Sequence, residues 1–291
     1  MKYTFWLSGL LILFISCENT YEKKVNEPYS FFVAGHTYGK PLATNLGLHP
    51  PFKAAFPIIK SHPGIKLGVL TGDLVRYATQ ESWDSVNTDL SQLGMSVYIA
   101  PGNHDIDEQN YFRTYFGDTV NDRPTYRQFI VNNDLFIVLD GNIDKWSIKG
   151  DQLKFLKKTL DQHSNEVRNI FVFIHQLIWW NKNNEFRNVK LNWPPDTPDS
   201  TNYWTEIEPI LNNQNKPVMI FAGDLGANKN ATPLLYYKKN NIEYIAGGMG
   251  NMVNDNFVIA NIDEDGEVSF DLIALQGDPD RLGKLTDYKL P

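Results

Sequence analysis

Five apolar runs of this 291-residue sequence are followed at once by residues that bind metal ions or transfer protons. These residues carry imidazole, carboxylate or amide groups: His36, Asp73, the triplet Asn103-His104-Asp105, His175 and Asp224. Ligands of α/β sheets collect beyond the carboxyl ends of the strands, so these side chains are expected to meet in one cleft. Glycine ends four of the five runs, which allows the backbone to turn sharply there. The pattern predicts a metal-ligand constellation.

The charges of this constellation also favour a cation. Asp73 and Asp224 would share the cleft with Asp105 nearby, and their repulsion is costly in a partly dry site unless a cation neutralises it. Imidazole, carboxylate and amide oxygen, without sulfur, suit Mn, Fe or Zn. Such an ion would neutralise a phosphoryl oxygen and lower the pKa of a bound water. The expected cofactor is therefore a divalent metal ion, in one or two copies.

Three motifs, in this order and each after an expected strand, resemble those of the calcineurin-like metallophosphoesterases. They are GDLVRY at 72–77, GNHDID at 102–107 and FIHQLIWW at 173–180. The resemblance covers the chain from about residue 30 to about residue 275. It implies an α/β fold of two packed mixed β-sheets flanked by α-helices, a four-layer αββα sandwich. It also implies a two-metal centre that hydrolyses phosphate esters.

The resemblance assigns roles to residues that match the motifs. Asp73 matches the carboxylate that bridges both metal ions, and Asn103 and His175 match ligands of the second ion. His104 matches the residue that contacts the substrate phosphate and protonates the leaving group, with Asp105 orienting it. His104 and Asp105 are thus the expected catalytic pair.

Two motifs depart from the family pattern, and both concern metal ligands. The family's aspartate-x-histidine is His36-Thr37-Tyr38 here, and its glycine-histidine-x-histidine is Gly223-Asp224-Leu225-Gly226. Four donors for the second ion remain: Asp73, Asn103, His175 and Asp224. The first ion would have only Asp73, His36 in place of a carboxylate and Tyr38 in place of an imidazole. We therefore expect an altered site with an incomplete two-metal centre.

Several of these residues also have a plainer interpretation. His36 is either a metal ligand or a donor to a backbone carbonyl or to Asp73, and with Tyr38 it would hold the substrate phosphate in place of the missing ion. Tyr38 is expected to contact phosphate or to pack as a ring, because a phenol with a pKa of about 10 ligates well only as phenolate. Asp224 could simply belong to a Gly-Asp turn. The remaining histidines in the body of the chain are expected to be bystanders: His49, His62 and His163.

Strands and helices alternate along the chain, which predicts an α/β sheet with helices outside. The expected strands are 30–34, 66–70, 96–100, 126–131, 135–139, 169–174, 218–222, 242–247, 257–262 and 268–275. The last three are interpreted as a mostly antiparallel closing set. The expected helices are 52–60, 80–93, 107–115, 150–164 and 203–212.

The stretch 181–203 is polar, rich in proline and without regular pattern, which is typical of a functional excursion or a lid. Four tryptophans surround it: Trp179, Trp180, Trp193 and Trp204. They are expected to pack under the loop, with stacking on a sugar or base as the alternative.

The N-terminus is expected to direct export. Lys2 precedes an apolar run too short to be a stable membrane anchor, and the run ends at Cys17, the only cysteine of the chain. The pattern resembles a bacterial lipoprotein signal, and a plain signal peptide is the alternative. The expected division is a signal peptide at 1–16, a lipidated N-terminus and tether at 17–28, and a phosphoesterase domain at 29–291. The protein would then be extracytoplasmic and anchored to a membrane by its lipid.

The overall composition excludes several other classes. Hydrophobic residues make up 42% and charged residues 21%, which is ordinary for a folded globular chain. A net charge of −7 without a basic stripe gives no nucleic-acid binding surface. Two functional hypotheses remain: hydrolysis of a phosphate mono- or diester, or a catalytically inactive binding or scaffold lipoprotein that kept the fold.

Overall fold

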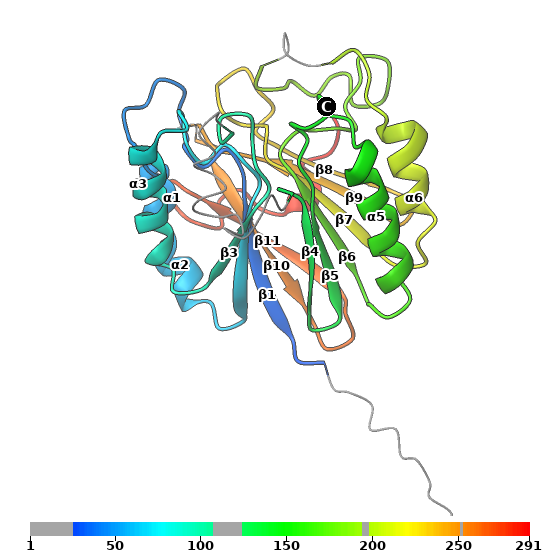
Figure 1. The fold of residues 1–291 in the computed structure, drawn as a ribbon. Helices are drawn as coiled ribbons and strands as arrows, with labels where there is room; N and C mark the ends of the chain where they lie inside the picture. Colours follow the sequence, from blue (N-terminus) through cyan, green and yellow to red (C-terminus); the bar gives the residue numbers. More distant parts are fainter. Residues whose placement is uncertain (1–25, 107–123, 194–197, 251–252) are drawn as a thin grey trace, which may run out of the picture.

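The computed structural model describes residues 26–106, 124–193, 198–250 and 253–291, which form two packed β-sheets (Figure 1). The first sheet has the order β11-β10-β1-β2-β3. Its strands are β1 (Tyr29–Ala34), β2 (Ile65–Leu70), β3 (Ser96–Ile99), β10 (Asn256–Ile262) and β11 (Val268–Ala274). The second sheet has the order β4-β5-β6-β7-β9-β8. Its strands are β4 (Arg127–Val131), β5 (Asp134–Val138), β6 (Ile170–Ile174), β7 (Val218–Ala222), β8 (Leu234–Lys239) and β9 (Ile242–Gly247).

Helices cover the outer face of each sheet, which gives four layers (Figure 1). The first sheet is covered by α1 (Pro50–Ala54), α2 (Phe56–Ser61) and α3 (Gln80–Ser91). The second is covered by α5 (Gly150–His163) and by α6 (Glu208–Asn212), which continues a π-helical turn at Tyr203–Ile207. A 3-10 turn, Leu285–Asp287, lies near the end of the chain. The expected αββα sandwich is confirmed.

The central strands are apolar on both faces because both faces are covered. Along β1, Phe31 points into the layer between the sheets, where it contacts Phe136 and Phe171, while Phe32 packs toward the helices against Phe52. β1, β2 and β3 pair in parallel, and so do β5, β6, β7 and β9. The carboxyl ends of these strands therefore meet at one rim of the sandwich.

The ten strands expected from the sequence are all present, each with both ends within one residue of the prediction. β8 was not expected, and β9 pairs in parallel with β7, although β10 and β11 are antiparallel as predicted. The expected helix 52–60 is divided into α1 and α2, because Pro57 has no N–H to continue it. The expected helix 107–115 lies outside the described residues.

In the part of the chain that the structure describes, no helix combines the length and the apolar character needed to cross a bilayer. Cys17 and the predicted signal peptide lie outside the described residues. Of the predicted tether, residues 26–28 are described, and Asn26 and Glu27 accept hydrogen bonds from Asn133 and Asn132 in the turn between β4 and β5.

Candidate functional site

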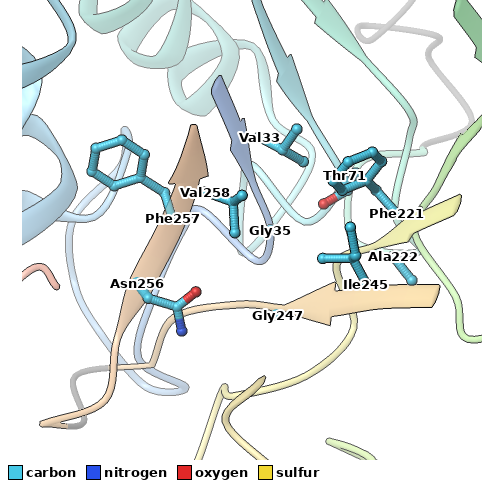
Figure 2. Close-up of a pocket in the computed structure, with 10 residues that line it drawn as sticks. All are labelled: Val33, Gly35, Thr71, Phe221, Ala222, Ile245, Gly247, Asn256, Phe257 and Val258. Carbon is cyan, nitrogen blue, oxygen red and sulfur yellow. The ribbon is translucent and has the colours of Figure 1, made fainter. Parts of the chain in front are cut away.

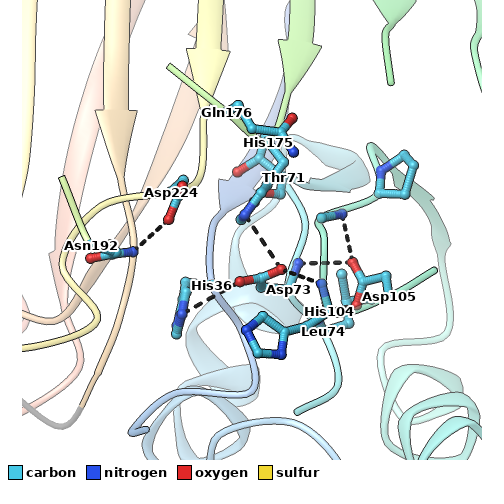
Figure 3. A network of polar contacts seen from close by, with 12 residues as sticks. His36, Thr71, Asp73, Leu74, His104, Asp105, His175, Gln176, Asn192 and Asp224 are labelled. Atoms are coloured by element: carbon cyan, nitrogen blue, oxygen red, sulfur yellow. Dashed lines mark hydrogen bonds and ion pairs between the residues drawn. The ribbon is translucent and has the colours of Figure 1, made fainter. Parts of the chain in front are cut away.

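The predicted site residues lie at the rim where the parallel strands of both sheets end (Figure 3). His36 follows β1, Asp73 follows β2 and His104 follows β3, while His175 and Asp224 follow β6 and β7 of the other sheet. Glycines allow the two sheets to approach here. A Cβ on Gly223 would lie 1.8 Å from the Thr71 carbonyl oxygen, and one on Gly35 would lie 2.5 Å from the Gly223 Cα.

The backbone at two site residues occupies the left-handed region. His36 has φ of 51° and Asp73 has φ of 55°, and Gly72 before Asp73 has φ of 82°. Non-glycine residues rarely adopt such angles, and they cluster at sites whose surroundings hold them in place. Here the loops hold each other, since the His36 N–H donates to the Gly72 carbonyl and the Tyr38 N–H donates to the Asp73 carbonyl.

Asp73 is at the centre of the site, with one imidazole beside each carboxylate oxygen (Figure 3). His36 Nε2 lies 3.5 Å from Oδ2, and His175 Nε2 lies 3.4 Å from Oδ1. The His104 backbone N–H also donates to Oδ1, at 3.2 Å. All three side chains, His36, Asp73 and His175, are buried.

Backbone carbonyls fix the orientation of both rings. His36 Nδ1 lies 3.0 Å from the Met249 carbonyl oxygen, and His175 Nδ1 lies 2.8 Å from that of Thr71. A carbonyl only accepts, so each Nδ1 carries a proton and each Nε2 is directed at Asp73. His175 Nε2 is buried with no hydrogen-bond partner among the described residues. This is how proteins hold metal-ligating histidines.

The charges at the site are strongly coupled. Burial acts to raise the pKa of Asp73, but His175 and then His36 outweigh it and hold that pKa below its ordinary value. Burial acts to lower the pKa of His175, but the carboxylates of Asp73 and Asp224 outweigh it and raise the pKa to about 10. For His36, burial prevails and lowers the pKa, so its ring is neutral. In the absence of an ion, protonated His175 therefore balances Asp73.

His104 is oriented by a backbone carbonyl, whereas the sequence led us to expect Asp105. His104 Nδ1 lies 2.8 Å from the Arg76 carbonyl oxygen, which leaves Nε2 as the nitrogen free to act on a ligand. The buried Asp105 carboxylate instead accepts from the backbone N–H groups of Asp73, Leu74 and Gly102, each at 2.8 Å. Asp105 therefore holds the Asp73 loop in shape and does not reach a substrate.

The two remaining expected ligands of the second ion are not joined to Asp73. Asp224 accepts a hydrogen bond from Asn192 Nδ2 at 2.9 Å, while its own N–H donates to the His175 carbonyl. The Asn103 side chain is exposed and has no hydrogen-bond partner among the described residues. Asn192 was missed by sequence reasoning, because nothing in the irregular loop 181–203 marks which of its residues reaches the site.

Tyr38 fits a hydrogen-bond donor and not a metal ligand. Its ring lies 4.3 Å from that of His36 and 5.2 Å from that of His104, centroid to centroid. Burial, and then the Asp73 carboxylate, raise the pKa of Tyr38 far above its ordinary value, so the phenol stays protonated. Gly226 supplies no side chain, as the sequence indicates.

The spacing of the donors around Asp73 suits a divalent ion. Two ligands bound at about 2.1 Å to one tetrahedral ion stand roughly 3.4 Å apart, and the two N–O distances at Asp73 match this spacing. Within the described ranges, however, no three His, Cys, Asp or Glu side chains are arranged to share one ion. The residues therefore fit an open site, in which Asp73 with His175, or Asp73 with His36, supplies two ligands.

His49 is not the surface bystander that the sequence suggested. Its side chain is buried at the start of α1, and its Nε2 lies 3.5 Å from Asp255 Oδ2. The tryptophans mostly pack as expected: Trp179 is buried against Tyr203 and Tyr244, and the indole N–H groups of Trp180 and Trp204 donate to backbone carbonyls. Trp193 is the exception, with 66% of its surface exposed.

A small cavity lies below the rim, between the ends of β1, β7, β9 and β10 (Figure 2). Its volume is about 20 Å³, enough for one water molecule, which needs roughly 10–15 Å³. Thr71 and Asn256 contribute the polar side chains of its lining, among mostly apolar neighbours. The cavity is therefore large enough for a water molecule and too small for a substrate.

Comparison with known proteins gives one family and two informative structures. The model of the family described as calcineurin-like phosphoesterase matches residues 36–248, well over half of the chain. No curated protein is detectably similar in sequence. A purple acid phosphatase from yellow lupin (Lupinus luteus) seeds is similar in structure, with a TM-score of 0.60 and 12% identity over 91% of this chain and 53% of that one.

A protein assigned as a 5′-nucleotidase from Staphylococcus aureus has a TM-score of 0.50 and 13% identity over 87% of this chain and 55% of that one. The chain therefore spans about half the length of both solved proteins. At these identities the two likenesses concern the fold.

Proposed function

The chain belongs to the calcineurin-like phosphoesterase family, whose members hydrolyse phosphate esters with metal ions, and we propose that it hydrolyses a phosphate mono- or diester at an altered site for one or two divalent ions. The observation that carries the proposal is the pair of imidazoles directed at Asp73, each with its Nδ1 held by a backbone carbonyl. Such fixed rings serve to bind a ligand in the open position beside a carboxylate.

The ion would be held by Asp73 and His175, with Asn103 and Asp224 as the further ligands that the family resemblance assigns. Mn, Fe and Zn all suit these nitrogen and oxygen donors. A bound divalent ion supplies charge neutralisation for a phosphoryl oxygen and a water acidified toward neutrality. His36 stands beside the other oxygen of Asp73, where it would bind a second ion or the phosphate itself.

The remaining residues position the phosphate and deliver a proton. His104, with Nδ1 committed to the Arg76 carbonyl, would donate from protonated Nε2 to the leaving-group oxygen. The neutral phenol of Tyr38, between the rings of His36 and His104, would donate a hydrogen bond to a phosphoryl oxygen. Asp105 keeps the loop of Asp73 in its left-handed conformation through three backbone N–H groups.

The test is to measure bound Mn, Fe and Zn per chain in the purified protein and to assay 4-nitrophenyl phosphate and bis(4-nitrophenyl) phosphate with each metal. Turnover that is lost in Asp73→Ala and in His104→Ala supports the proposal. A bound metal without turnover of any ester would overturn it in favour of the second candidate, an inactive binding or scaffold protein. The lost ligands at Tyr38 and Gly226 favour that candidate.

We also propose that the protein acts outside the cytoplasm, anchored to a membrane through lipid on Cys17. The basic start, the short apolar run and the position of the single cysteine support this. Asn26, the first described residue, contacts Asn133 at the end of the sandwich opposite the site. An anchor on that side would leave the site facing away from the membrane. Mass spectrometry of the mature N-terminus tests the proposal, and an unmodified cysteine would contradict it.

A further inference from the structure

One peptide group lies between the site and a buried carboxylate. The carbonyl of Met249 is 3.0 Å from His36 Nδ1, and the N–H of Gly250, in the same peptide group, donates to Asp255 Oδ1 at 3.0 Å. Because a peptide group is planar, fixing its N–H also fixes the direction of its carbonyl. Asp255 thus determines where the acceptor for His36 points.

Asp255 is itself braced from the other side. Its Oδ2 lies 3.5 Å from His49 Nε2, and both side chains are buried. The ring of His49 packs against Gly39, where a Cβ would lie 2.2 Å from His49 Nδ1, and the His49 backbone N–H donates to the Thr37 carbonyl. The loop that follows His36 therefore rests on the same histidine that faces Asp255.

Apart from the Gly250 N–H, no described group donates a hydrogen bond to the Asp255 carboxylate. Both ring nitrogens of His49, and Oδ2 of Asp255, are buried without a hydrogen-bond partner among the described residues. Two of these atoms, His49 Nε2 and Asp255 Oδ2, face each other at 3.5 Å, and buried polar groups are normally paired, so the pair is expected to serve a local purpose. Besides the backbone bond from His49 to Thr37, the pair is connected to His36 through the Met249–Gly250 peptide.

We propose that Asp255, supported by His49, is a positioning residue that orients His36 through the Met249–Gly250 peptide group and keeps the His36 Nε2 lone pair directed at the ligand beside Asp73. The inference rests on the proposed function in so far as His36 binds the ion or the phosphate. A carboxylate, a peptide and an imidazole in series polarise one another, which makes Nε2 a better ligand. Loss of such an orienting partner typically costs about 10- to 100-fold in metal affinity or activity.

The test compares three substitutions in the full protein. Asp255→Ala removes the acceptor of the Gly250 N–H, whereas Asp255→Asn keeps an acceptor oxygen at the same place. Asp263→Ala is the matched control: like that of Asp255, its carboxylate accepts from backbone N–H groups, here two at 2.9 and 3.0 Å, but in the turn beyond β10 at the opposite end of the sandwich. If Asp255→Ala does not fold, Asp255→Ser, too short to reach Gly250, replaces it.

Two readouts are measured: the ¹⁵N chemical shifts of the His36 ring, assigned with His36→Ala, and the affinity for Mn²⁺ by titration calorimetry. We expect Asp255→Ala to lose the Nδ1–H form of His36 and to bind Mn²⁺ 10- to 100-fold more weakly. Asp255→Asn should retain most of the Nδ1–H form and most of the Mn²⁺ affinity. Asp263→Ala should leave both properties unchanged. In a His36→Ala background, Asp255→Ala should have no further effect, because it acts through His36.

The inference is overturned if Asp255→Ala leaves the His36 ring shifts unchanged, or if it weakens Mn²⁺ binding equally with and without His36. A wild-type protein that turns over no ester, but whose His36 ring responds to Asp255→Ala, would overturn the proposed function and leave the positioning role intact. An active protein whose His36 ring shifts do not change in Asp255→Ala would support the proposed function and overturn the positioning role.

Discussion

Two buried carboxylates, Asp73 and Asp134, stand at opposite ends of the sandwich and are used in opposite ways. Asp134 Oδ2 accepts from Arg168 Nη2 at 2.7 Å and from the Tyr29 hydroxyl at 3.0 Å. Its Oδ1 accepts from the backbone and side-chain nitrogens of Asn169, both at 3.1 Å. Among the described residues, the Asp73 carboxylate accepts one hydrogen bond, from the His104 backbone N–H, and otherwise faces imidazole nitrogens at 3.4 and 3.5 Å.

The difference separates a carboxylate that is saturated with hydrogen bonds from one that still has room for a ligand. A buried charge that is fully hydrogen-bonded fixes the fold around it and has no lone pair left for a ligand. A buried charge whose neighbours stand at ligand spacing is costly to the fold and useful to an incoming cation. Burial alone therefore does not distinguish the two carboxylates. They differ in how many lone pairs of their oxygens already accept hydrogen bonds.

The difference between Asp73 and Asp134 is tested most directly by neutralising each carboxylate with the same substitution. Asp73→Asn removes the charge that an ion requires, and we expect esterase activity to fall more than about 100-fold, beyond the usual effect of an orienting residue. Its free energy of unfolding should change less than that of Asp134→Asn. Initial rates and urea unfolding measure the two effects, and an active Asp73→Asn protein would contradict the assignment.

Asp134→Asn should show the reverse behaviour. The amide nitrogen that replaces Oδ2 would face two donors and leave the partly buried Arg168 guanidinium without its counter-charge, which costs up to about 3–5 kcal/mol of stability. Activity per folded molecule should stay at the wild-type value, because the site is at the other end of the sheets. Urea unfolding at constant pH tests this, with Asp263→Ala as the exposed control. A loss of specific activity without a loss of stability would remove the distinction between the two carboxylates.

The affinity of the site around Asp73 for a metal ion should depend on pH. Neighbouring carboxylates raise the pKa of His175 to about 10, so the ion-free protein holds this proton through neutral pH and an ion must displace it. The affinity for Mn²⁺ should therefore increase by about tenfold per pH unit between pH 6 and 8. Calorimetry in buffers of different protonation enthalpy measures the released proton. His175→Gln should abolish the slope, and Asp134→Asn should keep it.

The same proton has a consequence for the stability of the ion-free protein. The folded-state pKa of His175 lies above its unfolded value, so its contribution to stability is complete below about pH 6.5 and is lost as the pH increases toward about 10. Urea unfolding of the chelator-treated protein across this range measures the loss. His175→Gln should show a flatter profile, and an unchanged profile would contradict the ion pair with Asp73.

The smallest effects on activity and stability are expected from removing one tyrosine hydroxyl near Asp73 and one near Asp134. Tyr38→Phe should lower kcat/KM by about tenfold, the value of roughly one hydrogen bond to a charged group, and leave the unfolding free energy nearly unchanged. Tyr29→Phe deletes the donor to Asp134 and should cost about 1–2 kcal/mol of stability with no change in kcat/KM. Equal effects of both substitutions on kcat/KM would mean that Tyr38 has no contact with substrate.

The strands were predictable because apolar runs bounded by glycine and polar residues leave few other interpretations. β8 escaped because it is an edge strand: Leu234 and Leu235 are buried in succession, and Lys238 and Lys239 follow, so neither an alternating nor a continuous apolar pattern appears. The division of α1 from α2 was readable in principle from Pro57.

The site was predictable where a side chain directly follows a strand, as at Asp73 and His175. It was not predictable where a partner comes from irregular backbone, as with Asn192, or through a backbone group, as with the Arg76 carbonyl on His104. The prediction that His49 is a bystander in a loop or on a helix surface was wrong, because a histidine just before the prolines that begin a helix is usually exposed to solvent. Whether a polar side chain is buried depends on loop packing, which periodicity does not record.

The hydrogen bond from His175 to the Thr71 carbonyl joins the two sheets at the site, since Thr71 follows a strand of one and His175 a strand of the other. No half of the molecule holds the whole constellation. The site is therefore assembled only when the two sheets pack together. A folding intermediate with only one sheet formed would have no activity. Any separation of the sheets would extinguish activity before either sheet itself melts.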